Sequence, residues 1–472
     1  MIMPVVIAGG KGTRLWPASR EGLPKPYAGI GGGETTLLQA TLQRLVHLGD
    51  CSAHLIVCNA THDFLAREQS AAVLGTPAGL LLEPQGRNTA PAICAAALAI
   101  SLWHGSDEPM LVLPADHVIS NVGALALAVT RGVDLARQGL LVTFGVAPTH
   151  AATGYGYLKL GAAINVNCAQ YRVEAFVEKP DAERARGFLA QGGYAWNSGM
   201  FMFRPSAVIA AFAQLAPDIL VACRSALTDC PAGPVMRLDA TAFAAAEAIS
   251  IDYAIMEKSD NVAAVVTDLE WSDVGDWHAV WDIALKDENG NDRRGNAQLI
   301  DCSGSLVHSD GPLVVGIGLT DMLAVATPDA VVIAPRRRAQ DIRFAVDVLI
   351  ASGHEEVILS RKVLRPWGSF ERLHVGPGFQ VKELIVKPGA KLSLQRHRFR
   401  AEHWVCVAGE GIVTLGEKCQ PIAVNQAINI PLGAIHRLEN PGTELLRVIE
   451  VQIGDYTGED DIERLEDIYG RV

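Results

Sequence analysis

Three glycines follow the first apolar run of the chain, and two cations come soon after them. Gly9, Gly10 and Gly12 leave backbone N–H groups uncovered, and Arg14 and Lys25 add positive charge. Backbone amides can form an anion-binding nest, and cations neutralise a polyphosphate. The stretch matches neither the dinucleotide GxGxxG fingerprint nor the GxxxxGK[ST] loop. It therefore predicts a phosphate site of another kind, with a surface turn carrying incidental charges as the alternative.

An acidic residue follows a later apolar run. Asp116 ends the stretch "PMLVLPAD", which is typical of a buried strand. In a doubly wound sheet, ligands bind at the carboxyl ends of the strands. We therefore expect Asp116 and the glycine loop to lie near one crevice.

Segments that could position these residues alternate along the first 280 residues. The runs "MPVVIAG", "HLIVCN", "GLLLEP" and "LLVTFGV" are strand-like, and "TTLLQATLQRLVHLG" has helical periodicity. This alternation predicts an α/β domain with a mostly parallel sheet over residues 1–285. The Ala-rich run at 90–103 predicts a buried helix.

The chain changes character after the polar stretch "KDENGNDRRGN". Short strands and a helix near 339–353 predict a β-rich connector over 286–355. From 356 to 472, short strands separated by Gly/Pro turns predict an antiparallel β-barrel or jelly roll. A last helix is expected in "EDDIERLEDIYG".

Bulk composition restricts the class of protein. The chain has 472 residues, of which 49% are hydrophobic and 19% charged, so it should form two or three globular domains. A net charge of −12 argues against a general nucleic-acid or anionic-membrane binder. Nine cysteines without a CxxC pair suggest reduced thiols in a cytoplasmic protein. We expect no signal peptide and no transmembrane helix.

The opening stretch "AGGKGTRLWPASREGLPKP" resembles the signature of sugar nucleotidyltransferases, in particular mannose-1-phosphate guanylyltransferases. The likeness continues through residues 81–93, 113–119, 143–158, 176–180, 196–204, 250–258 and 270–277. It implies a Rossmann-like, GT-A-like nucleotidyltransferase domain with a mixed, mostly parallel sheet. Transfer of a nucleotidyl group depends mainly on positioning and charge neutralisation.

The resemblance also implies roles for individual residues. Mg²⁺ would be held by Asp116 and Asp273, with Asp276 as a rival and an ordinary helix cap as the alternative reading. Guanine, rather than another base, is implied only by the family likeness. The remaining candidates are Arg14, Lys25 and Lys179 for catalysis, Gly9, Gly10, Gly12, Gln85, Arg87 and Asn88 for the nucleotide, and Gly154, Glu178, Lys179 and Asn197 for the sugar phosphate. Lys11 and Pro26 depart from the family pattern.

Residues 387–411 and 430–442 resemble the two cupin motifs, in the form found in type II phosphomannose isomerases. The resemblance implies a divalent metal, Zn²⁺ or another, on Gln395, His397, Glu402 and His436. A polar surface strand is the alternative. His403 would transfer protons, although its place next to Glu402 turns it away from the metal on a regular strand. Lys382, Arg464 and Arg471 would bind the sugar phosphate, the last two from one face of the terminal helix. Arg396, Arg398 and Phe399 depart from the family pattern.

The sequence thus predicts two activities. One makes GDP-mannose and pyrophosphate from GTP and mannose 1-phosphate, and the other interconverts fructose 6-phosphate and mannose 6-phosphate. Three alternatives stay open: a barrel that serves only oligomerisation or regulation, a non-catalytic sensor of GDP-mannose, and a different nucleotide or hexose. A homo-oligomer is also left open.

Overall fold

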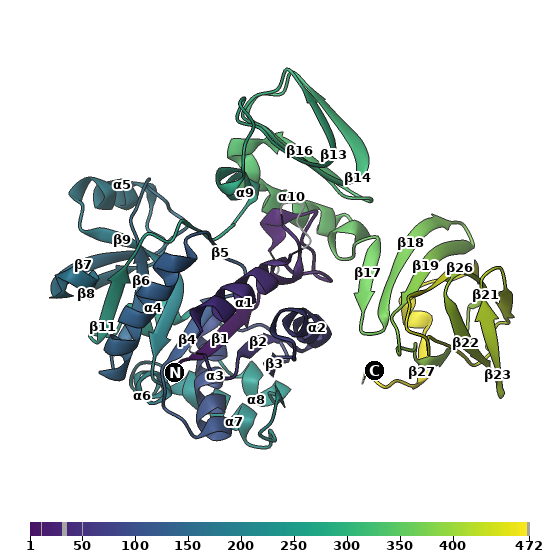
Figure 1. Ribbon diagram of the computed structural model, residues 1–472, viewed down its shortest axis with the longest axis horizontal. Coiled ribbons are helices and arrows are strands. Elements are labelled where there is room, and N and C mark those ends of the chain that lie inside the picture. Colours follow the sequence, from purple (N-terminus) through teal and green to yellow (C-terminus); the bar gives the residue numbers. More distant parts are fainter. Residues whose placement is uncertain (11, 31–34, 50, 470–472) are drawn as a thin grey trace. The chain divides into compact units, whose positions relative to one another are not determined.

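The computed structural model describes residues 1–10, 12–30, 35–49 and 51–469 (Figure 1). The chain forms two compact units. Unit 1 comprises Met1–Ser19, Pro24–Ala326 and Val331–Ala345, and unit 2 comprises Arg20–Leu23, Thr327–Ala330 and Val346–Val472. Most of the predicted connector is thus grouped with the N-terminal region, and the two predicted domain boundaries stay predictions. Among the described residues, no helix has the length and apolar character needed to cross a membrane.

A ten-stranded sheet forms the centre of unit 1, in the order β10-β3-β2-β1-β4-β9-β6-β11-β8-β7. The strands from β10 to β4 are parallel, and β9 runs antiparallel between β4 and β6. The predicted α/β class with a mixed sheet is confirmed. The strands are β1 (Met3–Ala8), β2 (Leu55–Asn59), β3 (Gly79–Glu83), β4 (Met110–Pro114), β6 (Leu141–Val146), β7 (Tyr157–Asn165), β8 (Gln170–Val177), β9 (Tyr194–Phe203), β10 (Val235–Arg237) and β11 (Val262–Val266).

The strand order reverses direction at β1. The chain moves from β1 outward to β2 and β3, and then returns to β4 on the other side of β1. Such a reversal opens a crevice at the carboxyl ends of the two central strands. Gly9 follows β1 there, and Ala115, which precedes Asp116, donates its backbone N–H to the carbonyl of Ile7 at 3.0 Å. The glycine loop and Asp116 therefore lie at the same edge of the sheet.

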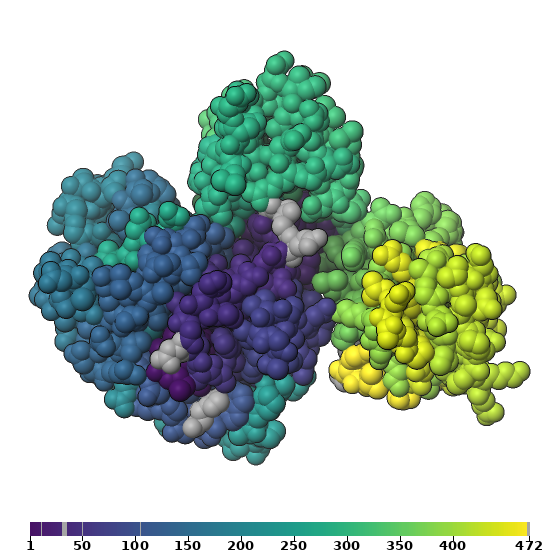
Figure 2. Space-filling view, viewed as in Figure 1, coloured from purple at the N-terminus to yellow at the C-terminus, as the bar shows by residue number. Residues whose placement is uncertain are grey.

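Helices cover both faces of this sheet. Right-handed crossovers place α1 and α2 on one face and α3 on the other. Accordingly, α1 contacts α2 and α4, whereas α3 contacts α6 and α7, and residues of α1 and α2 form part of the visible surface of unit 1 (Figure 2). The helices are α1 (Leu37–Leu48), α2 (Asp63–Leu74), α3 (Thr89–His104), α4 (Val122–Arg137), α5 (Ala182–Gln191), α6 (Pro205–Leu215), α7 (Pro217–Leu227), α8 (Ala240–Ala244) and α9 (Trp277–Ile283).

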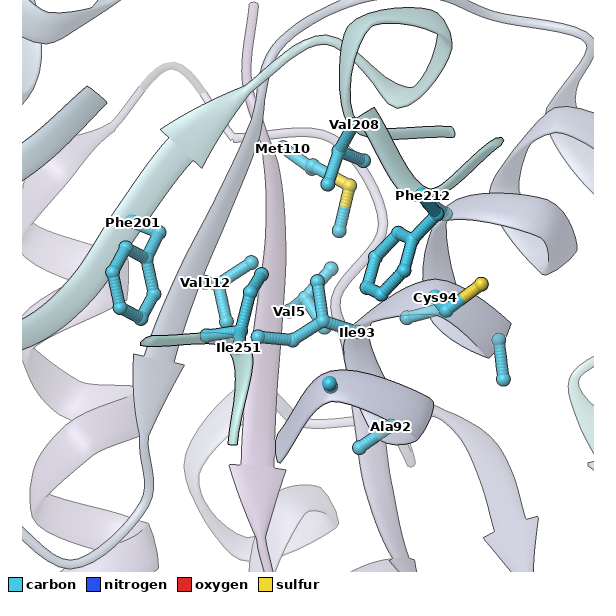
Figure 3. Packing of buried hydrophobic residues seen from close by; sticks show 14 of the residues in the cluster. Val5, Ala92, Ile93, Cys94, Met110, Val112, Phe201, Val208, Phe212 and Ile251 are labelled. Carbon is cyan, nitrogen blue, oxygen red and sulfur yellow. The ribbon is translucent and has the colours of Figure 1, made fainter. Parts of the chain in front are cut away.

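The main hydrophobic core lies between the sheet and the α3 layer (Figure 3). Val5 of β1 and Val112 of β4 are buried with Ile93 of α3 and Phe212 of α6. The Ala-rich run predicted as a buried helix is α3, whose small side chains let it pack closely against the central strands. Burial of this layer fixes the strands that carry the crevice residues.

A short ladder joins two distant parts of the crevice. Strand β5 (Val118–Ile119) pairs antiparallel with β12 (Trp271–Ser272), with Val118 opposite Ser272. Asp116 lies two residues before β5, and Asp273 directly follows β12. The ladder therefore brings two acids that are far apart in sequence to one place.

The connector forms a four-stranded sheet in the order β13-β14-β15-β16. The pairs β13–β14 and β14–β15 are parallel, and β15–β16 is antiparallel. The expected strands and the expected helix are all present. They are β13 (Asp292–Ile300), β14 (Leu306–Ile317), β15 (Met322–Ala326), β16 (Val331–Pro335) and α10 (Ile342–Ala351).

Unit 2 contains the predicted antiparallel double sheet. Its two sheets have the orders β17-β18-β19-β26-β21-β24 and β23-β22-β25-β20-β27, and side chains such as Trp404, Val413 and Leu438 fill the space between them. The strands are β17 (Lys362–Arg365), β18 (Gly368–Gly376), β19 (Phe379–Val386), β20 (Leu394–Arg396), β21 (Arg400–Ala408), β22 (Glu410–Leu415), β23 (Lys418–Ala423), β24 (Ala427–Ile430), β25 (His436–Glu439), β26 (Leu446–Gly454) and β27 (Glu463–Glu466).

The expected terminal helix is wrong. The segment forms a single 3₁₀ turn, Glu459–Asp461, followed by strand β27. Strand β27 pairs with β20, and Glu463 receives two hydrogen bonds from Arg396 at 2.7 and 3.0 Å. Pairing with a distant strand thus overrides the local helical pattern, as tertiary context often does.

Candidate functional sites

The loop after β1 is shaped by its glycines. Gly10 and Gly12 have φ of 94° and 64°, a region that glycine adopts readily. A Cβ on Gly12 would lie 2.5 Å from the Cβ of Lys25, whereas one on Gly9 or Gly10 would meet no protein atom within 4 Å. The loop therefore packs against Lys25 on one side and has open space on the other. Arg14 is exposed on the 3₁₀ turn Thr13–Leu15 that follows, and Lys11 lies outside the described residues.

Lys25 lies at the centre of the crevice. Its Nζ donates to Asp116 Oδ2 at 2.8 Å and to the backbone carbonyl of Asp273 at 2.6 Å. The Lys25 side chain is only 7% exposed. Burial raises the pKa of Asp116, but the charges of Lys25 and His117 lower it by more than burial raises it. The pKa of Asp116 is therefore below its ordinary value, and the carboxylate is ionised. The predicted phosphate-site cation and acid thus form one ion pair.

Asp273 and Asp276, the two acids of the segment "WSDVGDW" (residues 271–277), have different surroundings. Asp273 Oδ1 accepts from the Tyr155 hydroxyl at 3.2 Å and from the Gly275 N–H at 3.1 Å. Asp276 caps α9 by accepting from the Ala279 N–H at 3.0 Å. Asp273 thus contacts the Lys25–Asp116 pair through its backbone carbonyl, whereas Oδ1 of its rival Asp276 is used by the α9 cap. Tyr155, which orients Asp273, follows the exposed candidate Gly154.

A second polar cluster lies where β8 ends and β9 crosses the sheet. A Cβ on Gly156 would lie 2.5 Å from Glu178 Oε2 and 3.3 Å from the Asn197 Cβ, so these two candidates are neighbours. Lys179 Nζ lies 2.9 Å from Glu178 Oε1. Asn197 Oδ1 accepts from the Thr143 hydroxyl at 2.8 Å. The structure thus brings together Glu178, Lys179 and Asn197 of the predicted sugar-binding residues.

The sequence interpretation missed Asp252 in this cluster. Asn197 donates its Nδ2 to Asp252 Oδ1 at 2.9 Å. Asp252 begins the π-helical turn Asp252–Met256, an irregularity often found at functional sites. Burial, reinforced by the charge of Glu178, raises the pKa of Asp252 to about 6. Asp252 lies within the matched block "SIDYAIMEK" (residues 250–258), and this was the available signal.

Residues 85–90, "QGRNTA", form a loop whose side chains serve partly to stabilise local structure. Arg87 donates to the Ala244 carbonyl at 2.6 Å, and the Asn88 side chain, at φ 66°, caps α3 through the Thr89 N–H. Gln85 is exposed. Glu83, at the end of β3, was not predicted, yet it is buried and its Oε1 has no hydrogen-bond partner in the structure. Burial raises the pKa of Glu83 to about 8.

The barrel of unit 2 brings its candidate ligands into one cluster. The ligand atoms of His397, Glu402 and His436 all lie within 4.8 Å of one another, and all three residues are buried. Gln395 lies opposite His436 across β20 and β25 and shares a cavity with Glu402. These residues come from three strands and one turn that the barrel closure joins.

The donor atoms of this cluster suit a metal ion. His397 Nε2 and His436 Nε2 lie 3.0 and 3.4 Å from the Glu402 carboxylate, yet neither makes a hydrogen bond of good geometry. Burial raises the pKa of Glu402, but both imidazoles lower it more, so the net pKa is well below its ordinary value. Buried nitrogens aimed at a carboxylate, with a nearby amide oxygen, match the donors that divalent first-row metals prefer.

The structure corrects the role expected of His403. Its Nδ1 lies 2.8 Å from the Asn429 side-chain oxygen, on the face of β21 opposite to the buried Glu402 and Trp404. A regular strand alternates its side chains, so His403 cannot reach the cluster. It is therefore not supported as the proton-transfer residue.

The expected phosphate ligands of the barrel are placed differently from one another. Lys382 on β19 and Arg464 on β27 both line the cavity beside the cluster. Arg464 reaches it from a strand and not from the expected helix. Arg471 lies outside the described residues.

Three family models match successive parts of the chain. Residues 3–290 match the nucleotidyl transferase model, residues 295–349 match the MannoseP isomerase/GMP-like beta-helix domain, and residues 352–467 match the mannose-6-phosphate isomerase C-terminal model. Together these models cover most of the chain.

Relatives match over the full length. The alginate biosynthesis protein AlgA of Pseudomonas aeruginosa is 45% identical, over 100% of this chain and 98% of that protein. A mannose-1-phosphate guanylyltransferase of Klebsiella pneumoniae is 43% identical over 100% of both chains. Among solved structures, a protein of Thermus thermophilus described as a mannose-1-phosphate geranyltransferase is 34% identical, with a TM-score of 0.65 over 74% of this chain and 99% of that one.

Proposed function

Because the chain belongs to the mannose-1-phosphate guanylyltransferase family and carries a mannose-6-phosphate isomerase C-terminal domain, we propose that it performs both reactions. Unit 1 transfers GMP from GTP to mannose 1-phosphate, giving GDP-mannose and pyrophosphate. Unit 2 interconverts fructose 6-phosphate and mannose 6-phosphate. The observation that carries the first assignment is the convergence of Lys25, Asp116 and Asp273 at the strand-order reversal.

In the transfer reaction, a phosphate oxygen of mannose 1-phosphate attacks the α-phosphorus of GTP. The bond from that phosphorus to the bridging oxygen breaks, and pyrophosphate leaves. Amides of Gly9, Gly10 and Gly12 bind phosphate oxygens on the open side of the loop, while Lys25 and Arg14 neutralise charge. These groups position the reactants and stabilise the charge that develops.

Asp116 and Asp273 are the residues that would hold Mg²⁺ in unit 1. Their carboxylate oxygens are hard donors of the kind Mg²⁺ takes, and the Asp273 carboxylate is oriented by Tyr155 and Gly275. When bound, the ion would neutralise phosphate oxygens. Lys25 keeps Asp116 ionised and so available as a ligand.

The sugar is assigned to the cluster at β8 and β9. The Glu178 carboxylate and the Asn197 amide offer hydrogen bonds to sugar hydroxyls, and Lys179 pairs with the sugar's phosphate. The Asn197 amide donates its Nδ2 to Asp252, and this hydrogen bond fixes the orientation of the amide. Substrate positioning of this kind contributes directly to rate.

We assign the edge of the base to Glu83. Arg87 and Asn88 already use polar groups to bind Ala244 and to cap α3, whereas Glu83 Oε1 has no hydrogen-bond partner among the residues that the structure describes. Burial raises the pKa of Glu83 to about 8, so the carboxyl group is mostly protonated near neutral pH in the free protein. Two parallel N–H donors on the Watson–Crick edge of guanine, which adenine lacks, would favour the ionised carboxylate and pair with both of its oxygens. A base without these two donors would leave the buried Glu83 carboxylate unpaired, and its binding would therefore be disfavoured.

In the barrel, Gln395, His397, Glu402 and His436 would hold Zn²⁺ or another divalent ion. Bound there, the ion would polarise sugar oxygens during aldose–ketose exchange, which moves a proton between C1 and C2. Lys382 and its neighbours bind the sugar's phosphate end. Because both substrates and GTP are small intracellular metabolites, we place these activities in the cytoplasm.

A coupled assay for pyrophosphate release from GTP, mannose 1-phosphate and Mg²⁺ tests the first reaction. Asp116→Asn should lower kcat by about 100-fold or more, as loss of a transition-state charge contact does. Asp276→Asn is the matched control, because asparagine also caps helices and Asp276 makes only the α9 cap. No pyrophosphate from the unaltered protein, or equal losses in both variants, would contradict the assignment.

The alternative for unit 2 is a barrel that serves oligomerisation or regulation without catalysis. The buried His397, Glu402 and His436 cluster favours a metal site over a purely structural barrel. Turnover of fructose 6-phosphate with added Zn²⁺ or Co²⁺ separates the two readings. A panel of other triphosphates and hexose phosphates tests the choice of substrate.

A further inference from the structure

A cavity in unit 2 joins the candidate metal ligands to a group of cations. Gln395 and Glu402 line one part of it, and Arg365, Lys382 and Arg400 line another. The cavity measures about 40 Å³. That is room for one or two water molecules, whereas sites for small-molecule ligands occupy roughly 300–1,000 Å³. A hexose phosphate can enter only if part of the lining moves.

The lining part that covers the cations is an acidic loop, residues 455–461, between β26 and β27. Its Glu459 carboxylate contacts Lys382 Nζ through Oε1, and Oε2 lies 3.9 Å from Arg365 Nη2. The carbonyl of Gly458 accepts from Arg400 Nη1 at 2.7 Å. One carboxylate and one carbonyl of the acidic loop thus occupy three cations.

Lys382 requires an anion at this end of the cavity, whereas Arg400 also pairs with Glu402 at 3.2 Å and with Asp461 at 3.7 Å. The side chains of Lys382 and Arg400 are 3% and 1% exposed, and a buried cation without a counter-charge is costly. Burial raises the pKa of Glu459, but Lys382, Arg365 and Arg400 lower it more, so it is ionised. A phosphate monoester has nearly twice the charge of a carboxylate and three acceptor oxygens, so it can replace Glu459 with a gain.

The acidic loop is tied at both ends, and between them it is held by the contacts of Gly458 and Glu459 and by a hydrogen bond from the Tyr456 hydroxyl to Asp460. At one end the Gly454 N–H donates to the Gly378 carbonyl at 3.0 Å. At the other end the buried Asp461 carboxylate accepts from the N–H groups of Arg398 and Phe399 at 3.0 and 3.2 Å. Asp455, Tyr456 and Asp460 between them are exposed. Outward movement of the loop therefore requires the release of both Glu459 and the Gly458 carbonyl from the cations.

We propose that Lys382, Arg365 and Arg400 form the subsite for the phosphate group of a sugar phosphate, and that Glu459 occupies this subsite until a phosphate displaces it. The proposal rests on the isomerase half of the proposed function. It has a consequence for selectivity: an unphosphorylated hexose cannot displace Glu459, so it does not open the cavity.

Binding to the full-length protein tests the exchange. Isothermal titration calorimetry measures the affinity of inorganic phosphate, mannose 6-phosphate and mannose. Glu459→Gln keeps the size of the side chain and removes its charge, and it should tighten both phosphate ligands by about 10-fold or more, which corresponds to about 1.4 kcal/mol. Mannose should not gain affinity. Asp455→Asn is the matched control, since it removes one negative charge from an exposed position of the same loop.

Removing a cation gives the converse result. Lys382→Met should abolish binding of both phosphate ligands, and Arg365→Met, whose side chain is 30% exposed, supplies a second variant if Lys382→Met fails to fold. Equal or weaker phosphate affinity in Glu459→Gln than in Asp455→Asn overturns the exchange. Fructose 6-phosphate turnover separates the two proposals. If the protein is inactive but Glu459→Gln raises its phosphate affinity, the isomerase function is refuted and the exchange is supported. If the protein is active but Glu459→Gln does not raise its phosphate affinity, only the exchange is refuted.

Discussion

At the scale of single residues, the chemistry of both sites depends on buried groups whose charge is set by one or two neighbours. Lys25 and Asp116 form an ion pair in which each group needs the other, because a buried charge without its partner is strongly unfavourable. Glu83 and Asp252 are the opposite case, since burial moves their pKa values upward. These differences in pKa and in charge pairing can be tested by substitutions of single side chains.

Glu83→Gln should reduce selectivity for the base. Glutamine keeps the shape but offers one acceptor and one donor in place of two acceptors, so one guanine N–H loses its partner. We expect kcat/KM for GTP to fall by about 10-fold, which matches the typical energy of one hydrogen bond to a charged group. Steady-state kinetics with GTP and ATP measure the change. An unchanged GTP:ATP ratio would remove Glu83 from the base site.

Asp252→Asn should alter the dependence of stability on pH. The pKa of Asp252 is raised from 3.8 to about 6, so the folded state holds a proton that the unfolded state has lost. Stability is therefore greatest below about pH 4 and falls as the pH rises through about 6, by up to about 3 kcal/mol. Asparagine cannot ionise, yet it can still accept from Asn197, so the variant should be the more stable protein above pH 6.

Thermal unfolding midpoints of both proteins between pH 4.5 and 7.5 measure this difference. The midpoint of the unaltered protein should fall relative to that of Asp252→Asn as the pH rises. Parallel curves would show that Asp252 is ionised in the folded state across this range.

At the scale of elements, two local devices place the crevice residues. The glycine loop turns tightly enough to leave Lys25 in contact with it, and the β5–β12 ladder places Asp273 beside Asp116. Neither device contributes a large core. Their effect is geometric, so their loss should affect activity more than folding.

Gly12→Ala tests the loop. The new Cβ would lie 2.5 Å from the Lys25 Cβ, and the left-handed φ adds roughly 1–2 kcal/mol of strain. Because a misplacement of about 1 Å can cost about 100-fold in rate, we expect kcat for pyrophosphate release to fall by about that factor. Gly75→Ala is the control, since Gly75 has φ 77° but no atom within 4 Å of its Cβ. Equal rate losses in both variants would point to general destabilisation.

At the scale of the whole molecule, the two candidate sites belong to two compact units, each with its own core. Each site is built from residues of its own unit: Lys25, Asp116 and Asp273 belong to unit 1, and His397, Glu402 and His436 belong to unit 2. The chemistry of one site should therefore survive damage to the other.

His397→Ala tests this independence. It removes one imidazole from the buried cluster, so turnover of fructose 6-phosphate should fall below detection. Pyrophosphate release from GTP and mannose 1-phosphate should change by less than about twofold. Both assays use the same preparation, with bound metal measured by mass spectrometry of the digested protein. Retained isomerisation would show that the cluster does not hold the catalytic metal.

The sequence by itself determined the local and repetitive features of this protein. Strand runs such as 3–8 and 110–114, the Ala-rich helix α3 and the glycine loop follow from periodicity and from residue type, which act over a few neighbours. The alternation of strands and helices was enough to predict an α/β unit, and short strands separated by Gly/Pro turns were enough to predict a β-barrel. The resemblance of the matched blocks to a known family implied most of the site candidates.

Only the tertiary structure decided which distant segments meet. The β5–β12 ladder distinguishes Asp273 from Asp276, pairing with β20 makes the terminal segment a strand and not a helix, and the face of β21 removes His403 from the cluster. Glu83 and Glu459 emerged only once burial and partners were visible. The physical reason is that strand pairing, burial and ion pairing depend on contacts between residues far apart in the chain, which no local pattern encodes.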